Sequence, residues 1–176
     1  VCSDKTGTLT QNRMTVTECY LDGKLTEKAG LKELFGAADT GGAALSCAAH
    51  FLLGCVLCND AETGEEGMGD PTELALLHMA QDCDAKVERL REKYPRINEI
   101  GFDSGRKMMT TLHRMPDGQT AYTKGAAERI LENCGHCFRG GSIAELTVTE
   151  RERLLGVQKR LMGEGRRVLA LAMEPE

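Results

Sequence analysis

The sequence predicts an α/β fold of the α+β type, in which a twisted, mainly antiparallel sheet is flanked by helices. Strand-like segments with alternating side chains occur at 97–104, 106–114 and 119–124. The sequence MPDG at 115–118 has Pro and Gly where a tight turn needs them, so it joins the last two strands into an antiparallel hairpin. Helical segments with capping residues precede and follow this hairpin.

The part of the chain before residue 60 predicts one strand and two helices. Residues 12–22 alternate and are rich in Thr and Val, which is typical of a strand. The Gly-punctuated stretch 27–42 predicts a helix, and the apolar stretch 43–58 predicts a buried helix. Because Ser46 and His50 interrupt this apolar stretch, and because it is shorter than the ~20 residues of a membrane-spanning helix, we expect it to belong to the core.

Two more helices are predicted before the sheet. Asp70 can cap a helix in which Pro71 takes the first position and Glu73 the third, so a helix begins at Asp70. Residues 85–94 form an amphipathic pattern that Pro95 ends.

The region after the hairpin predicts two helices and a closing strand. Residues 125–134 are helical in pattern. Thr149 and Glu152 have the spacing of a capping box for a helix that continues to about residue 162. Residues 166–173, RRVLALAM, predict the last strand.

The composition restricts the class of protein. The chain has 176 residues, a net charge of -5 and eight cysteines. This length fits one domain, or one domain with a fragment of another, and the charge argues against a nucleic-acid partner. The cysteines are expected to be reduced thiols, since a core of this size does not need disulfides. The chain begins with Val, so we expect an excised piece. We also expect this piece to be a monomer.

The predicted hairpin brings two lysines together. Pairing Arg114 with Gln119 pairs Met109 with Lys124, and side-chain alternation then places Lys107 on the same face as Lys124. Like charges arranged in this way suggest an anion such as a polyphosphate nearby. The alternative is that both lysines extend into water.

Phe102 lies just before the hairpin, in GFDSGRK. Most phenylalanines are buried, so Phe102 is either a core residue or a platform on which a nucleobase stacks. The sequence contains no Walker loop and no GxGxxG after a strand. Any nucleotide site must therefore be a surface cleft built from aromatic stacking and lysines.

The segment DKTGTLT, from Asp4 to Thr10, has the residues of a phosphoryl-transfer loop. The Asp4 carboxylate can attack phosphorus and form an acyl phosphate. In the phosphatases with a DxDxT loop a second Asp acts as the general acid and base, but here that position is Thr6. An aspartyl-phosphate at Asp4 should therefore persist.

Five ordered motifs resemble the P-type ATPases, a family of ion-pumping membrane proteins. DKTGTLT is similar to the phosphorylation motif of that family. Four later motifs resemble the stretches that line the nucleotide-binding domain of type II pumps, with calcium pumps as the nearest likeness. These motifs are GDPTE at 69–73, FDSGRKMM at 102–109, TKGA at 123–126 and RVLALA at 167–172.

The resemblance implies an N-domain fold and a role for individual residues. Residues 1–12 would be a fragment of the phosphorylation domain and the hinge, and residues 13–176 would bind ATP. Phe102 would stack on adenine, whereas Glu73 would either read the adenine edge or complete a capping box. Lys107 and Arg167 would meet the phosphates. The remaining implied pocket residues are Ser104, Met109, Lys124, Gly125, Ala126 and Leu169.

The resemblance also implies what the complete pump would add. Asp4, Lys5 and Thr6 would be catalytic, and Asp4 and Thr6 would hold Mg²⁺. The second acidic motif, the dephosphorylation loop and all membrane helices of the family are absent from the sequence. We therefore expect a cytoplasmic domain of an integral membrane protein, whose partners are ATP and the phosphorylation, actuator and transmembrane domains. Alone, it should bind ATP without turning it over.

Two alternatives remain open. The first is a free-standing phosphatase, similar to the haloacid dehalogenases, that uses Asp4. The second is a thiol-redox or zinc module, because CGHC from Cys134 resembles the motif of disulfide isomerases and Cys55 and Cys58 form another CxxC pair. The redox reading is disfavoured because Cys134 follows a helix, at the pole that does not favour a thiolate.

Overall fold

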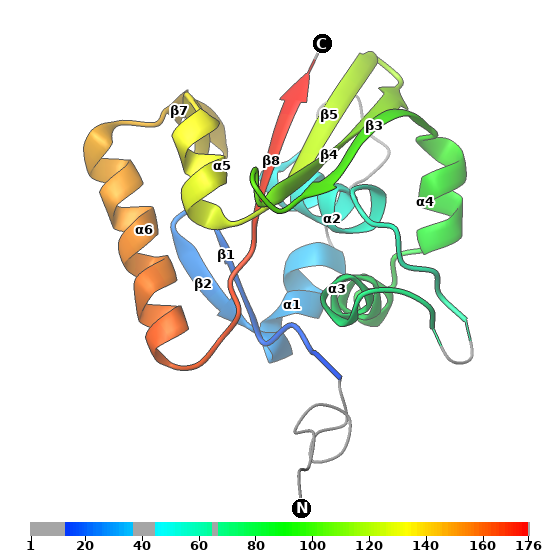
Figure 1. Ribbon diagram of the computed structural model, residues 1–176, viewed down its shortest axis with the longest axis horizontal. Helices are drawn as coiled ribbons and strands as arrows, with labels where there is room; N and C mark the ends of the chain where they lie inside the picture. Colours follow the sequence, from blue (N-terminus) through cyan, green and yellow to red (C-terminus); the bar gives the residue numbers. More distant parts are fainter. Residues whose placement is uncertain (1–12, 37–44, 65–66, 176) are drawn as a thin grey trace, which may run out of the picture.

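The computed structural model describes residues 13–36, 45–64 and 67–175, which form an α+β fold (Figure 1). The predicted fold class is confirmed. Asp4, Lys5 and Thr6, and the end of the predicted helix 27–42, lie outside the described residues. The elements in chain order are β1 Glu18–Leu21, β2 Lys24–Glu27, α1 Lys28–Gly36, α2 Cys47–Leu57, α3 Pro71–Asp82, α4 Val87–Lys93, β3 Arg96–Asp103, β4 Met108–Met115, β5 Gly118–Gly125, α5 Ala127–Asn133, β6 His136–Arg139, β7 Ser142–Glu145, α6 Val148–Gly163 and β8 Ala170–Pro175.

The main sheet has the strand order β3-β4-β5-β8, and all neighbouring strands are antiparallel. The predicted hairpin is confirmed with its register, since Arg114 pairs with Gln119 and Met109 with Lys124. Figure 1 shows this sheet at the upper centre, with α4 on its β3 side and α5 and α6 on its β8 side.

The core lies between this sheet and the helices α2 and α3. Leu53 and Leu57 of α2 and Leu77 of α3 are buried, and Tyr122 of β5 is buried beneath them. Because side chains alternate between the two faces of β5, Tyr122 and Lys124 both point to the face that these helices cover, which we call the covered face. Within the described ranges, no helix has the length and apolar character needed to cross a bilayer.

The helix starts follow local capping chemistry. The Asp70 side chain accepts a hydrogen bond from the Thr72 N–H, and Pro71 opens α3, as predicted. For α6 the predicted cap was wrong: the N-cap is Thr147, whose hydroxyl accepts from the Glu150 N–H, and not Thr149. Both Thr residues precede a Glu by three positions, so the sequence pattern alone fits either.

Two short hairpins were not predicted. The predicted strand 12–22 contains only β1, and β2 follows it after a two-residue turn at Asp22 and Gly23. Both turn residues have positive φ, 49° and 83°, as the turns of two-residue hairpins require. The second hairpin, β6–β7, turns at Gly140 and Gly141 in the same way.

His113 is buried in the core beneath Tyr122. Its Nδ1 donates a hydrogen bond of 2.9 Å to the Tyr94 carbonyl, and within the described residues its Nε2 has no hydrogen-bond partner. Burial lowers the pKa of His113, and this effect outweighs the hydrogen bond to Tyr94, which raises it. The folded state therefore holds His113 neutral at a pH where the unfolded chain binds a proton.

We expect the free energy of unfolding to fall as the pH drops from 7.5 to 5.5. Because the pKa of His113 is lower in the folded state, the unfolded chain takes up more protons below its pKa of about 6.5. Urea unfolding across this range should show a shallower pH slope for His113→Gln than for the wild type. The exposed His136 provides the control variant, His136→Gln, which should keep the wild-type slope. An unchanged slope in His113→Gln would contradict the assignment.

Gly125 allows β4 and β5 to approach closely at the end of the sheet. A Cβ at this position would lie 2.4 Å from the Lys107 carbonyl oxygen and 2.5 Å from the Met108 Cβ. Gly101 of β3, by contrast, has open space around it.

The substitution Gly125→Ala should lower the free energy of unfolding by about 1–3 kcal/mol, because the added methyl group collides with backbone that cannot move freely. The matched substitution Gly101→Ala should change it by less than about 0.5 kcal/mol. Urea denaturation followed by circular dichroism measures both values. Equal effects at the two glycines would show that the close approach at Gly125 does not constrain the sheet.

Candidate functional site: one end of the main sheet

Four residues, one from each strand, form a row at the end of the main sheet. Asp103 pairs with Met108, Met108 with Gly125, and Gly125 with Ala170. At this end β3 and β5 finish, whereas β4 and β8 begin. Residues next to this row in the sequence therefore meet at one place, although as many as 67 positions separate Asp103 from Ala170 in the chain.

Most of the predicted site residues flank this row. We call this place the sheet-end site. The residues in or near the row that the sequence had singled out are Phe102, Ser104, Lys107, Met109, Lys124, Gly125, Ala126, Arg167 and Leu169.

The turn between β3 and β4 builds one side of the sheet-end site. The Asp103 carboxylate accepts the Arg106 N–H at 2.7 Å, and the Asp103 carbonyl accepts the Lys107 N–H at 2.7 Å. Lys107 adopts a φ of +57°, and its carbonyl accepts the Ala126 N–H at 3.0 Å. The turn is thus fixed both to its own start and to the end of β5.

Lys107 does not share the covered face with Lys124, so this part of the hairpin prediction was wrong. Lys107 precedes β4 and is exposed, whereas Lys124 is buried. The left-handed conformation of Lys107 breaks the side-chain alternation on which the prediction depended. The charge of Lys107 instead acts on Glu128 of α5, whose pKa is lowered mainly by a hydrogen bond from Gln158 and also by Lys107.

Lys124 forms a buried ion pair with Glu73. Its Nζ lies 2.7 Å from the Glu73 Oε1, and the two side chains are only 7% and 15% exposed. The other carboxylate oxygen of Glu73 accepts the Asp60 N–H at 3.2 Å. The side chain of Glu73 is therefore directed to Lys124 and Asp60 and not to the start of its own helix, which removes the capping-box explanation for this residue.

The loop after α2 supports Glu73, and sequence reasoning missed it. Asn59 is buried, and its side-chain amide donates to the carbonyls of Cys55 and Glu73, each at 3.0 Å. Its side-chain oxygen accepts the Ala61 N–H at 3.0 Å. Asn59 thereby joins the end of α2 to the first turn of α3. Its only sequence signal was a polar residue directly after an apolar helix.

Two arginines hold the same loop from the outside. Arg91 of α4 donates to the carbonyls of Val56, Asn59 and Ala61, and Arg96 of β3 donates to those of Leu57 and Asn59. Arg96 also pairs with Asp60 at 2.7 Å. These guanidinium groups satisfy carbonyls at the C-terminal end of α2, where no backbone N–H is available.

Arg167 reaches the first turn of α3 from the segment before β8. Its guanidinium donates to the Thr72 hydroxyl at 2.9 Å, and that hydroxyl lies 3.4 Å from the Met14 sulfur. Arg167 remains exposed, so its charge faces solvent beside the sheet-end site.

The sheet-end site also exposes apolar surface. Phe102 is 68% exposed and Leu169 36%, whereas Met109 is buried in the core. The core interpretation of Phe102 was therefore wrong. An exposed aromatic ring in a chain with 4% aromatic residues is available to stack on a planar ligand.

The cysteine motifs do not form a reactive centre. Burial raises the pKa of Cys134 and of Cys58, which disfavours the thiolate in both. All cysteines within the described ranges are free thiols. Within those ranges there is also no group of three or more His, Cys, Asp or Glu that could hold a metal ion. The zinc alternative thus finds no support there.

The fold and the sheet-end site together define an antiparallel α+β domain with exposed aromatic, aliphatic and cationic groups at one end of its sheet. Residues 47–176 match the family described as P-type ATPase, cytoplasmic domain N, and the chain belongs to this family.

Known members of this family are similar over nearly the whole chain. Calcium-transporting ATPase 1 of Bacillus cereus is 38% identical over 175 residues, and that of Lactococcus lactis is 36% identical over 177 residues. The sodium/potassium-transporting ATPase subunit alpha-2 of Gallus gallus is 35% identical over 182 residues. These matches cover 99%, 99% and 96% of the chain but only 19%, 19% and 18% of the relatives. The chain thus spans about a fifth of their length.

Breaking the buried ion pair should destabilise the fold more than breaking an exposed one. Lys124→Met leaves the Glu73 carboxylate buried without its partner, which should cost about 3–5 kcal/mol. The double variant Glu73→Gln, Lys124→Met should recover part of this loss, with a coupling energy of about 0.5–3 kcal/mol. Urea unfolding of all four members of the cycle gives these values.

The exposed pair between Arg129 and Glu132 serves as the control, because its side chains are 44% and 60% exposed. Arg129→Met should cost less than about 1 kcal/mol. Additive effects of Glu73→Gln and Lys124→Met would contradict a direct interaction between the two buried groups.

Proposed function

We propose that the chain is the ATP-binding domain of a cation-transporting P-type ATPase and that it presents ATP to Asp4 in the complete pump. The observation that supports this proposal most strongly is the row at the end of the sheet, which gathers residues from three separate motifs around Asp103, Met108, Gly125 and Ala170. The relatives named above, which are calcium-transporting and sodium/potassium-transporting ATPases, agree with it.

In this proposal the adenine base and the phosphates of ATP contact different kinds of side chain. The exposed Phe102 ring stacks on adenine, beside Leu169. Glu73 accepts a hydrogen bond at the adenine edge, next to Lys124. Because Glu73 already neutralises Lys124, the cations left for the phosphates are the exposed Lys107 and Arg167. Ser104, Met109, Gly125 and Ala126 complete the walls of the pocket.

Mg²⁺ belongs to the proposal only as the partner of ATP in the complete pump. Its proposed protein ligands, Asp4 and Thr6, lie outside the described residues. When bound, Mg²⁺ neutralises phosphate charge. The residues of the sheet-end site bind and orient the nucleotide, and Lys107 and Arg167 supply positive charge for its phosphates.

The remaining parts of the proposal concern the parent protein. We infer that residues 1–12 connect the domain to the phosphorylation domain, and that actuator and transmembrane domains are its other partners. The domain would face the cytoplasm, bind ATP as a monomer and leave turnover to the complete pump, in which Asp4, Lys5 and Thr6 act as the catalytic loop.

A chemical-shift titration of the chain with ATP tests the proposed site. We expect selective changes near Phe102, Lys107, Lys124 and Arg167. Phe102→Ala should raise the Kd for ATP at least about fivefold, because stacking of one base contributes about 1–3 kcal/mol. Ile100→Ala is the matched control, since Ile100 lies on the same strand and is 57% exposed. It should leave the Kd within about twofold.

Two results would reject this function. The first is a set of unperturbed signals at those four residues with millimolar ATP. The second is magnesium-dependent turnover of a phosphomonoester by the chain, lost in Asp4→Asn, which would favour the phosphatase alternative.

A further inference from the structure

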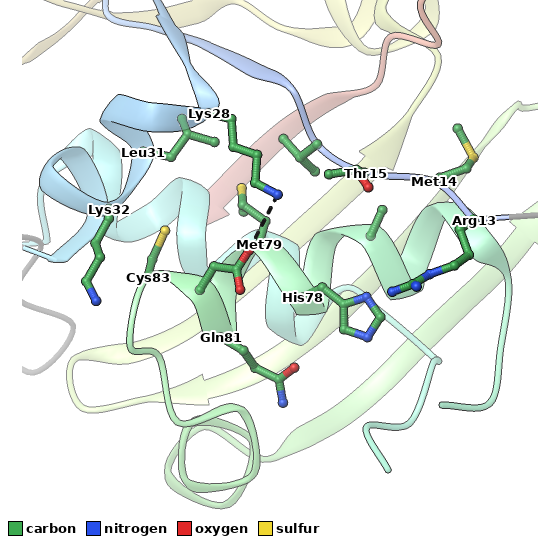
Figure 2. A pocket seen from close by; sticks show the side chains of 13 residues that line it. Arg13, Met14, Thr15, Lys28, Leu31, Lys32, His78, Met79, Gln81 and Cys83 are labelled. Carbon is green, nitrogen blue, oxygen red and sulfur yellow. Dashed lines mark ion pairs between the residues drawn. The ribbon is translucent and has the colours of Figure 1, made fainter. Parts of the chain in front are cut away.

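A cavity of about 340 Å³ lies along α3, from Ala75 to the C-terminal end of the helix at Cys83. It is enclosed by the segment 13–16, the helix α1 and the last turns of α3 (Figure 2). Its volume is at the small end of the range for ligand sites in proteins. No residue of the sheet-end site lines it, so we call it the α3-end cavity.

The lining of the α3-end cavity carries more positive than negative charge. Arg13, Lys28 and Lys32 contribute three cations, and Asp82 is the single carboxylate of the lining. The whole chain, by contrast, has a net charge of -5. A cationic lining on an acidic protein favours an anionic ligand.

The cations of the lining are not equally available. Lys28 lies 3.8 Å from Asp82, and Lys32 lies 3.1 Å from Asp84. Both lysines also face the C-terminal end of α3, where the helix dipole favours positive charge. Arg13 differs, because it is exposed and makes neither an ion pair nor a hydrogen bond within residues 13–36, 45–64 and 67–175.

His78 lies at the same end of the cavity as Arg13. Figure 2 shows both side chains on the α3 side, whereas Lys32 lies at the far end. His78 is exposed and, within the described ranges, has no hydrogen-bond partner. A guanidinium and an imidazole N–H can both donate to one anionic group.

The rest of the cavity is apolar. Leu31 of α1 and Met79 of α3 are buried at its base, and Val16 and Ala75 complete the base. The sulfur of Met79 is polarisable and adapts to flat or irregular apolar groups. A ligand that fits this lining combines an apolar body with a single anionic head.

We propose that the α3-end cavity binds a small amphiphilic organic anion, whose apolar ring or short chain covers Met79 and Leu31 and whose carboxylate, sulfonate or phosphate meets Arg13 and His78. Such a ligand touches the segment 13–16, α1 and α3 at once. The site shares no lining residue with the proposed nucleotide site, although its Met14 lies beside Thr72, to which Arg167 donates.

Naphthalene-2-sulfonate is a suitable probe, because it has a flat apolar body and one anionic head. In a titration of the labelled chain, the Met14 and Met79 methyl groups and the Gln81 amide should shift and saturate. Arg13→Gln should weaken binding about tenfold through loss of a charge-assisted hydrogen bond. Lys159→Gln, an exposed charge removal on α6, should leave the affinity unchanged. The neutral analogue 2-naphthalenemethanol should bind at least about fivefold more weakly.

Ala75→Leu should abolish binding by filling the cavity; if this variant fails to fold, Arg13→Gln decides the result, since Arg13 is exposed. Saturating ATP should leave the probe shifts intact. The proposal is overturned if millimolar probe leaves the cavity signals unmoved, if the neutral analogue binds equally well, if Arg13→Gln and Lys159→Gln have the same effect, or if the probe shifts only Phe102 and its neighbours.

Discussion

The ion pair between Glu73 and Lys124 is the constraint on which the sheet-end site depends. Removing two charges from water costs several kcal/mol each, so such a pair is tolerated only where its geometry is fixed and its remaining polar atoms are satisfied. The chain meets this requirement with the Asp60 N–H on Glu73 and with Asn59 beneath the loop. The ion pair thereby fixes the first turn of α3 against the last residues of β5. As a result, the carboxylate of Glu73 lies beside the end of the sheet.

This pair also sets the charge that a ligand would meet. A buried lysine without a partner would dominate the site, but Glu73 cancels it at 2.7 Å. Among the predicted site residues, the remaining positive charge belongs to Lys107, in the turn between β3 and β4, and to Arg167, in the segment before β8, and both are exposed. The site therefore presents the exposed apolar groups Phe102 and Leu169 together with these two cations, which suits a ligand with one apolar and one anionic end.

Several features of this chain that depend on neighbouring residues could be predicted from the sequence, whereas those that depend on distant contacts could not. The cap at Asp70 and the pairing of Met109 with Lys124 followed from short patterns, because a cap and a hairpin register are fixed by a few adjacent residues. The left-handed turn at Lys107 overrode the alternation, and nothing nearby in the sequence marks it. The hydrogen bonds from Arg91 and Arg96 to the loop after α2 join residues about 30 to 40 positions apart, so no local pattern reveals them.

The two proposed ligand sites meet near the first turn of α3, because Met14 lines the α3-end cavity and its sulfur lies 3.4 Å from the Thr72 hydroxyl, to which Arg167 donates. Arg13 precedes Met14 in the chain, so a ligand at Arg13 could influence Arg167 through Met14 and Thr72 without a shift of α3 as a body. Leu77 and Ala80 are fully buried against the core, so such a shift would disrupt close packing along the whole helix. Any influence of one site on the other would therefore pass through Met14 and Thr72 and not through movement of α3.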